Sequence, residues 1–323
     1  MVDCVKKEGY SKFSLEYFTK INPLYIVLAL IFHISSLFIW SARMKILAKA
    51  TGGSVSFLKS FEILLSSLFA ACITPSEVGG EPVKIYLLSE ENVSFGDATA
   101  VVVTERFLDV IFLVLVSPLG LFIFWDLVLT GGLIIIPIIA VAFFITVFSL
   151  LLLIMFRPEV LKSIVNLIFG IILRIWRGER IKRIINRIND EIDTFINGMW
   201  TLAKKRSEMA LASGCTVSRW LIDLCTVPLI LIGMGSEPYV VYSFGAQILL
   251  VVLLLAPITP GGSGIAEIGS ATIFSTFIES VPVGVLVFLH RFVTYHFNLI
   301  LGAVISALVL KDMKLVRRML GGV

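Results

Sequence analysis

The sequence predicts an all-α, polytopic transmembrane helix bundle that contains two re-entrant units arranged as an inverted repeat. Of the 323 residues, 58% are hydrophobic and 15% are charged, whereas soluble domains contain about 45–50% and about 25%. The apolar residues are gathered into long blocks, and two further apolar stretches are interrupted by proline and glycine. A soluble protein of this length does not need so many long apolar blocks to build a core.

Five apolar blocks are long enough to cross a bilayer, which requires about 20 helical residues. These blocks are 22–41, 98–125, 131–156, 208–234 and 283–310. We therefore expect a multi-pass protein of the plasma membrane with a single membrane domain over 1–323.

Within that domain, a first unit over about 22–125 precedes a second unit over about 208–310. The segment 157–206 between them carries Ile181, Ile184 and Ile188 at the spacing of an amphipathic helix. We expect this helix either to lie on the cytoplasmic leaflet or to form a solvated connector.

The net charge of +4 comes from basic clusters at 43–59, 157–206 and 311–318 rather than from a nucleic-acid-binding surface. Cytoplasmic loops carry the excess of Lys and Arg, so all three clusters are expected inside the cell. This placement requires both interrupted units to be re-entrant and puts the N-terminus outside.

Two apolar stretches end abruptly. The stretch 57–74 is followed by Pro75 and a Gly-Gly pair, and 239–258 is followed by Thr259-Pro260-Gly261-Gly262. Proline pushes the preceding residue out of helical geometry, and irregular backbone at membrane depth occurs where it lines a cavity or is buried in protein. The two breaks are therefore predicted to line a binding site.

The two breaks form a repeat. A constant offset aligns Thr74, Pro75, Gly79, Arg106 and Phe107 with Thr259, Pro260, Gly264, Arg291 and Phe292. An acidic residue follows each break, Glu81 in the first and Glu267 in the second. Paired interrupted segments in two halves of a chain indicate the binding site of a transporter.

Ionisable residues within the apolar blocks are the other candidates for function, because burying a charge in a membrane is costly. The candidate substrate-binding residues are Thr74, Glu81, Glu105, Arg106, Asp109, Thr259, Gly261, Gly262, Glu267, His290 and Arg291. Arg106 with Asp109 and Arg219 with Asp223 have the three- and four-residue spacing of same-face pairs, and Arg219 and Asp223 are predicted to form a structural ion pair. Lys84 is expected at a water boundary, and Trp40 and Trp220 are expected to be interface anchors.

The chain contains no phosphate-binding loop, no His-Glu-x-x-His helix and no Gly-x-Ser-x-Gly elbow. We therefore expect no enzymatic activity, no cofactor and no metal site.

Three ordered motifs resemble those of the lysylphosphatidylglycerol synthase transmembrane-region family, whose members are also described as flippase-like. They are the run from Pro75 to Glu81 with 104–109, the run from Pro260 to Glu267, and the run from His290 to Tyr295. The resemblance covers roughly 20–312. Ala266 stands where many members carry a basic residue.

This resemblance implies a protein that handles membrane lipids, either a phospholipid or a polyprenyl-phosphate. We expect a translocase in which a phosphate-containing headgroup enters a polar cavity lined by Glu81, Arg106, Glu267 and Arg291. Two alternatives remain. One is a membrane enzyme, or the partner of a membrane glycosyltransferase, that acts on a polyprenyl-phosphate-linked sugar. The other is a structural scaffold.

Overall fold

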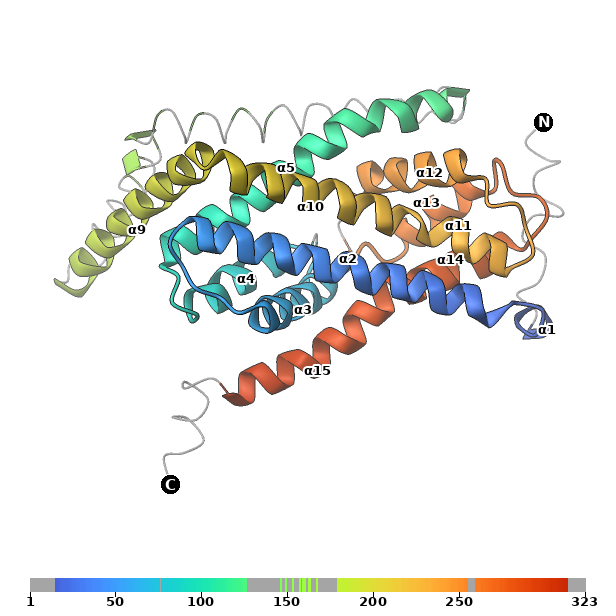
Figure 1. The fold of residues 1–323 in the computed structure, drawn as a ribbon, viewed down its shortest axis with the longest axis horizontal. Coiled ribbons are helices and arrows are strands. Elements are labelled where there is room, and N and C mark those ends of the chain that lie inside the picture. The colour runs from blue at the N-terminus through green and yellow to red at the C-terminus, as the bar shows by residue number, and fades with distance from the viewer. Residues whose placement is uncertain are drawn as a thin grey trace.

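A computed structural model describes residues 15–75, 77–126, isolated positions between 146 and 167, 179–254 and 259–312. In these ranges the named elements are helices (Figure 1). The predicted span 131–156 lies almost entirely outside the described residues. The all-helical fold class is confirmed.

Three helices of the first half, α2, α3 and α5, begin at capping residues that the sequence supplies. The Asn22 side chain accepts a hydrogen bond from the Leu24 amide at 3.0 Å, and Ser56 and Ser94 accept in the same way from the amides of Lys59 and Asp97. The helices are α1 (Leu15–Phe18), α2 (Pro23–Ala50), α3 (Phe57–Ile73), α4 (Gly80–Ser89) and α5 (Phe95–Ile123).

The second half follows the same order of a long helix, a shorter helix, a break, a short helix and a long helix. Its last long helix contains a π-helical segment, η1. The elements are α9 (Glu179–Lys204), α10 (Arg206–Leu224), α11 (Thr226–Gly233), α12 (Val240–Leu253), α13 (Ile265–Phe274), α14 (Val283–Arg291), η1 (Phe292–His296) and α15 (Phe297–Asp312).

Four helices within the described ranges are long and apolar enough to cross a membrane. They are Pro23–Ala50, Phe95–Ile123, Arg206–Gly233 and Val283–Lys311. Each coincides with one of the predicted blocks, although the first helix continues well beyond residue 41, where its apolar block ends. This extension brings Arg43 into the span.

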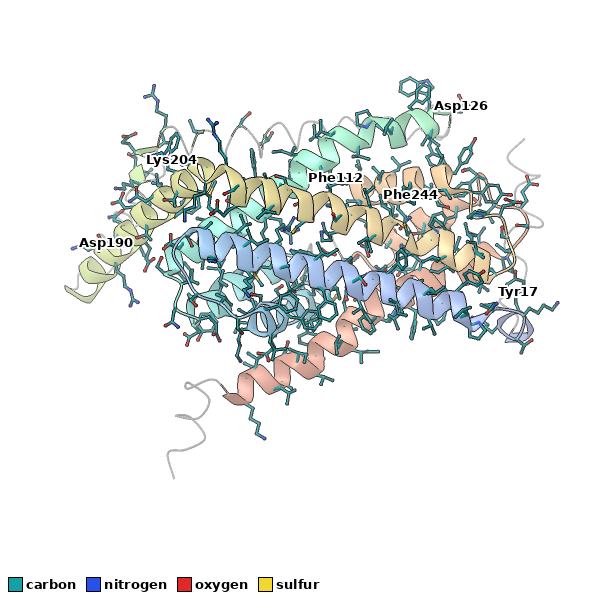
Figure 2. All side chains as sticks on the ribbon, in the orientation of Figure 1. Tyr17, Phe112, Asp126, Asp190, Lys204 and Phe244 are labelled. Atoms are coloured by element: carbon teal, nitrogen blue, oxygen red, sulfur yellow. The ribbon has the colours of Figure 1, made fainter. Side chains whose placement is uncertain are left out.

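The first long helices of the two halves run in opposite directions. Helix α2 packs side by side with the continuous pair α10 and α11, and the two run antiparallel (Figure 1). Helices α3 and α4 lie toward the end of the molecule where α9 is found, whereas α12 and α13 lie toward the other end. Figure 2 shows the same division, with Asp190 and Lys204 at the α9 end, Tyr17 at the opposite end, and Phe112 and Phe244 between them.

The buried apolar side chains form two main cores, and each core takes residues from both halves of the chain. One joins the C-terminal half of α2 to α3, α4, α5, α9, α10 and α15, with Met44, Leu64 and Leu88 fully buried. The other joins α11, α12, α13 and α14 to the N-terminal half of α2 and the end of α5, with Ile230 and Leu286 fully buried. The two halves are therefore packed together through both cores as well as along α2 and α10.

Helix α9 confirms the predicted helix, but its C-terminal part packs on protein. The Gly96 amide donates to Glu191 Oε2 at 2.7 Å, and Phe195 and Ile196 are buried in the first core. A side chain at Gly198 would contact Ala100 and Asp97. This face of α9 is covered by α5 and is unavailable to a leaflet.

Candidate functional site

The two interrupted segments meet. Pro75 and Pro260 form an isolated antiparallel β-bridge, and the Tyr295 hydroxyl donates to the backbone oxygen of Cys72 at 3.2 Å. Segments that are far apart in the sequence therefore contact each other where α3 ends and α13 is about to begin. The interrupted backbone is held by protein contacts from the other half, as polar backbone at membrane depth requires.

Thr74 and Thr259, both predicted to bind substrate, are engaged in holding these turns. Thr74 Oγ1 donates to the Ala70 carbonyl at 2.8 Å and accepts from the Gly79 amide at 2.9 Å. Thr259 Oγ1 donates to the Ser263 carbonyl at 2.8 Å. Each threonine thus satisfies a backbone group that the break leaves without a helical partner.

The glycines of the second break are required by the backbone conformation. Gly261 and Gly262 have φ values of +55° and +64°, which residues with a side chain rarely adopt. A Cβ on Gly261 would also lie 2.3 Å from the Tyr295 ring. The predicted break is confirmed, and its close approach to Tyr295 explains the choice of glycine.

An acid–arginine pair follows each break. Arg106 Nε donates to Glu81 Oε1 at 2.6 Å, and a second guanidinium nitrogen contacts the same oxygen. In the second half, Arg291 Nε donates to Glu267 Oε1 at 2.8 Å, and its Nη2 donates to the Gly261 carbonyl at 3.2 Å. The repeat seen in the sequence therefore recurs as a matched pair of contacts.

Each acid lies in the first turn of the short helix after its break, α4 or α13. A carboxylate at this place interacts favourably with the helix dipole. Glu81 is also paired with Arg106, and Glu267 with Arg291. Each acid is therefore placed between a positive helix end and an arginine.

The two arginines differ in exposure. The Arg106 side chain is 50% exposed, although it lies well inside the span Phe95–Ile123. The Arg291 side chain is only 11% exposed, and its guanidinium carbon lies 4.1 Å from the centre of the Tyr295 ring. Arg106 is therefore the more accessible of the two candidate headgroup contacts.

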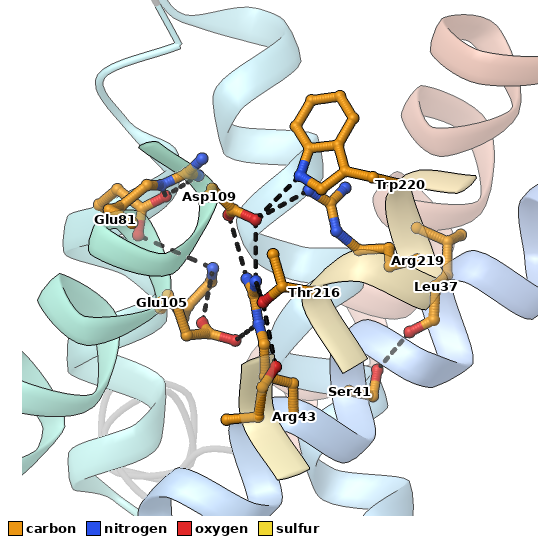
Figure 3. Close-up of polar contacts among 12 residues, drawn as sticks. Leu37, Ser41, Arg43, Glu81, Glu105, Asp109, Thr216, Arg219 and Trp220 are labelled. Atoms are coloured by element: carbon orange, nitrogen blue, oxygen red, sulfur yellow. Dashed lines mark hydrogen bonds and ion pairs between the residues drawn. The ribbon is translucent and has the colours of Figure 1, made fainter. Parts of the chain in front are cut away.

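Glu105 and Asp109, also predicted to bind substrate, belong to a buried charge network (Figure 3). Arg43 donates to Asp109 at 2.8 and 3.1 Å and to Glu105 at 3.1 Å. Lys84 Nζ donates to Glu105 at 3.3 Å. Glu105 is 1% exposed and Asp109 is 5% exposed. Arg43 and Lys84 already pair with these two carboxylates, which favours a structural role for Glu105 and Asp109.

Two predicted pairs are corrected. Arg219 pairs with Asp109 at 3.0 Å rather than with Asp223, and Asp223 instead contacts His33. Asp109 in turn does not pair with Arg106, which binds Glu81. The spacing along a helix places two residues on one face, but partners on neighbouring helices lie closer here and satisfy the charges.

The sequence does not identify Arg43 and Lys84 as members of this network. It predicts a cytoplasmic basic cluster for Arg43 and a water boundary for Lys84, yet the two residues are 0% and 1% exposed. The uninterrupted helical pattern beyond residue 41 could have indicated Arg43, since it extends the span past this charge. Nothing in the sequence near Lys84 indicates its partner Glu105.

Trp40 and Trp220, expected at the membrane interface, belong to the network as well. The guanidinium carbon of Arg219 lies 4.4 Å from both ring centres, and Lys84 Nζ lies 4.9 Å from the Trp40 ring. The Trp220 indole donates to Asp109 at 3.2 Å. Aromatic faces stabilise cations by such contacts, which are stronger when water is excluded.

His290 is 8% exposed, and its Nδ1 has no hydrogen-bond partner among the described residues. Its ring meets the edge of Phe274 at a centroid distance of 6.4 Å. In the described part of the chain, no three His, Cys, Asp or Glu residues are grouped so as to hold a metal ion.

The comparisons with known proteins agree on one family. The family model described as the lysylphosphatidylglycerol synthase TM region matches residues 15–302. A UPF0104 membrane protein of Archaeoglobus fulgidus is 31% identical over 288 residues, which cover 88% of this chain and 86% of the relative. A UPF0104 membrane protein of Methanocaldococcus jannaschii is 29% identical over 309 residues, covering 90% and 86%.

A third UPF0104 membrane protein, from Pyrococcus horikoshii, is 24% identical over 306 residues, which cover 90% of this chain and 88% of the relative. No solved structure matches the chain. The family match covers most of the chain, includes both breaks and their arginines, and agrees with the membrane-spanning helices. The chain therefore belongs to the lysylphosphatidylglycerol synthase transmembrane-region family of membrane proteins.

Proposed function

We propose that this protein is a lipid translocase that moves a phosphate-containing headgroup across the plasma membrane between its two halves. The observation that carries the proposal is the matched pair of contacts, Glu81 with Arg106 and Glu267 with Arg291, beside two breaks that touch. In this proposal the ligands are phospholipids or polyprenyl-phosphates, and the protein is a transporter rather than an enzyme.

The proposal includes a membrane topology. The two halves are inverted repeats, and the hairpins α3–α4 and α12–α13 are re-entrant from opposite faces. Support comes from the antiparallel course of α2 and α10 and from the location of the two hairpins at opposite ends (Figure 1). The C-terminal ends of α2 and α15 lie toward the α9 end, where the basic clusters would face the cytoplasm.

The chemistry of the pairs supports a phosphate. Arg presents a planar set of donors that matches phosphate oxygens as well as carboxylate oxygens. A headgroup phosphate can therefore replace the carboxylate as the partner of Arg106 in one half and of Arg291 in the other. Crossing hydrocarbon without such partners is costly for a charged group, so two exchangeable arginine contacts lower the barrier.

The test is a lipid-movement assay with purified protein in liposomes that carry fluorescent phospholipid or polyprenyl-phosphate probes. We expect wild type to accelerate probe movement over empty liposomes. Arg106→Lys and Arg291→Lys keep the charge but lose the planar donor set, so each should slow movement while the protein still folds. Arg187→Lys, on the exposed part of α9, is the matched control and should behave as wild type.

Two outcomes would replace the proposal. If no lipid class moves, but a glycosyltransferase reaction in native membranes depends on this protein, the protein is a partner in polyprenyl-phosphate chemistry. If neither activity is found and both arginine variants behave as wild type, the paired charges serve only to hold the bundle together.

A further inference from the structure

His33 has an oxygen acceptor at each of its two ring nitrogens. Nδ1 lies 2.8 Å from Asp223 Oδ1, and Nε2 lies 3.0 Å from Asn298 Oδ1. The ring is 4% exposed and meets the edge of the Phe297 ring at a centroid distance of 6.1 Å. This site lies apart from the acid–arginine pairs and has no place in the translocation scheme above.

The orientation of the Asn298 amide is set by a second contact. Asn298 Nδ2 donates to the Thr294 carbonyl at 2.6 Å, and the opposite orientation would bring two oxygens together at that distance. The amide oxygen therefore faces His33. An amide oxygen accepts and does not donate, so His33 Nε2 must carry a proton.

The contact with Asp223 then requires a second proton. A neutral imidazole has one N–H. If that N–H is at Nε2 and donates to Asn298, the unprotonated Nδ1 would face a carboxylate oxygen. The 2.8 Å contact is satisfied when Nδ1 also carries a proton and donates to the carboxylate. The single Ser36 hydroxyl proton is donated to the His33 carbonyl at 2.8 Å, so the 3.3 Å contact of Ser36 Oγ with the carboxylate does not decide its charge. The positive charge of Arg219 nearby favours the ionised carboxylate.

We propose that His33, Asp223 and Asn298 form a binding site for one exchangeable proton, held on an imidazolium that pairs with the Asp223 carboxylate. Resting on the proposed translocation, the inference adds that this proton controls the movement of the two halves against each other. The ligand is the proton itself, so translocation is coupled to pH or to a proton gradient.

The location of the three residues explains the coupling. His33 is on α2 of the first half, whereas Asp223 on α10 and Asn298 on α15 belong to the second half. If the halves rock apart, the imidazolium loses one or both acceptors and releases its proton. Because linkage is reciprocal, a bound proton favours the packed arrangement, and its loss favours the other arrangement.

The charged surroundings allow the proton to leave. Arg219 on α10 and His290 on α14 also interact electrostatically with Asp223. The positive charge of Arg219 opposes a second positive charge nearby, which prevents the imidazolium from being held permanently. The Asp223 side chain is 27% exposed and that of His33 is 5% exposed, so the proton exchanges on the carboxylate side.

One helix links the proton site to the translocation site. The π-helical segment Phe292–His296 separates Arg291 from Asn298, and the Asn298 amide is held by the Thr294 carbonyl inside it. π-Helical segments are rare and are frequent at functional sites. A displacement of Asn298 is therefore transmitted along this helix to Arg291 and its partner Glu267.

The first experiment measures the protonation of His33. The chain has three histidines, so protein labelled with ¹⁵N-histidine gives three imidazoles, which single His→Gln variants assign. At pH 8, where a free histidine with a pKa of about 6.5 is mostly neutral, we expect His33 to be an imidazolium. Asp223→Asn should convert it to the neutral form. A neutral His33 in wild type at pH 7 to 8 overturns the proton site.

The second experiment measures coupling in proteoliposomes with an imposed pH gradient. Lipid movement by wild type should change by at least about fivefold between opposite gradients, the lower end of usual coupling between sites. His33→Gln and Asp223→Asn should remove this dependence, whereas Glu62→Gln, in a surface pair with Lys59, should retain it. If Asp223→Asn does not fold, His33→Gln alone decides the result.

The outcomes separate the two proposals. Lipid movement by wild type that is the same in both gradients overturns the coupling and leaves translocation standing. An imidazolium at His33 in a protein that moves no lipid overturns translocation, and with it the coupling, while the proton site itself is supported.

Discussion

Asp109 shows how single residues hold charge inside this bundle. Its carboxylate accepts hydrogen bonds from Arg43, Arg219 and the Trp220 indole. This one buried carboxylate thus connects its own helix α5 to the two neighbouring helices α2 and α10. Removing one member of a buried pair is more costly than the net stability of the pair suggests, because the remaining charge stays desolvated.

We therefore predict that Asp109→Asn destabilises the protein by about 3–5 kcal/mol, the usual cost of breaking a buried ion pair. Thermal unfolding in detergent is the measurement. Glu267→Gln should cost less, because the Glu267 side chain is 41% exposed. Glu62→Gln, which alters a surface pair with Lys59, should change stability by about 1 kcal/mol at most.

An Asp109→Asn protein as stable as Glu62→Gln would show that the network contributes little to folding. The predicted pair of Arg219 with Asp223 would have placed this sensitivity at Asp223. Because Arg219 pairs with Asp109 instead, we expect the larger loss of stability at Asp109. Asp223 pairs with His33.

At the scale of elements, close helix packing also joins the two halves. Helix α15 of the second half packs on α3 of the first half, and Gly302 is at the contact. A Cβ on Gly302 would lie 2.6 Å from the Leu65 carbonyl oxygen and 2.8 Å from Phe69 Cβ. Small residues allow membrane helices to approach this closely.

Gly302→Ala should therefore destabilise the protein by about 1–3 kcal/mol, the usual cost of overpacking, because backbone at Leu65 cannot move away cheaply. Gly214→Ala is the matched control in helix α10. A Cβ there meets nothing within 4 Å, so the change should be neutral or stabilising by up to about 1 kcal/mol. Equal thermal unfolding of the two variants would contradict this packing argument.

At the scale of the whole molecule, the proposed inverted arrangement of the two halves determines on which side of the membrane each hairpin begins and ends. The hairpin α3–α4 begins after the loop at Ser54 and ends before Glu90, and α12–α13 begins after Glu237 and ends before Glu279. If both hairpins are re-entrant, each begins and ends on the same side of the membrane. If they cross fully, their ends lie on opposite sides.

We predict that cysteines at Ser54 and Glu90 label from the cytoplasmic side, and cysteines at Glu237 and Glu279 from the outside. The background replaces the four native cysteines, and all four new positions are exposed. The measurement is reaction with a membrane-impermeant thiol reagent in intact cells and in inverted vesicles. Labelling of Ser54→Cys and Glu90→Cys from opposite sides would exclude the re-entrant arrangement.

The sequence by itself determined the membrane class, four of the spans, both breaks and the recurrence of an arginine after each break. These features are local, since they follow from runs of apolar residues, from proline and glycine chemistry, and from spacing along one chain. The same reasoning predicted the arginine and glutamate of each half as candidates without predicting that they pair, Glu81 with Arg106 and Glu267 with Arg291.

Only the tertiary structure decided which charged residues form pairs. Arg219 and Asp223 have ideal spacing on one helix, yet Arg219 pairs with Asp109 and Asp223 pairs with His33, both on neighbouring helices. Lys84 looks like a boundary residue in the sequence, yet it is buried against Glu105. The partner of each charge depends on which helices pack together and at what register. Leaving a buried charge unpaired in a membrane costs several kcal/mol. A buried charge therefore pairs with the group that helix packing brings within hydrogen-bond distance.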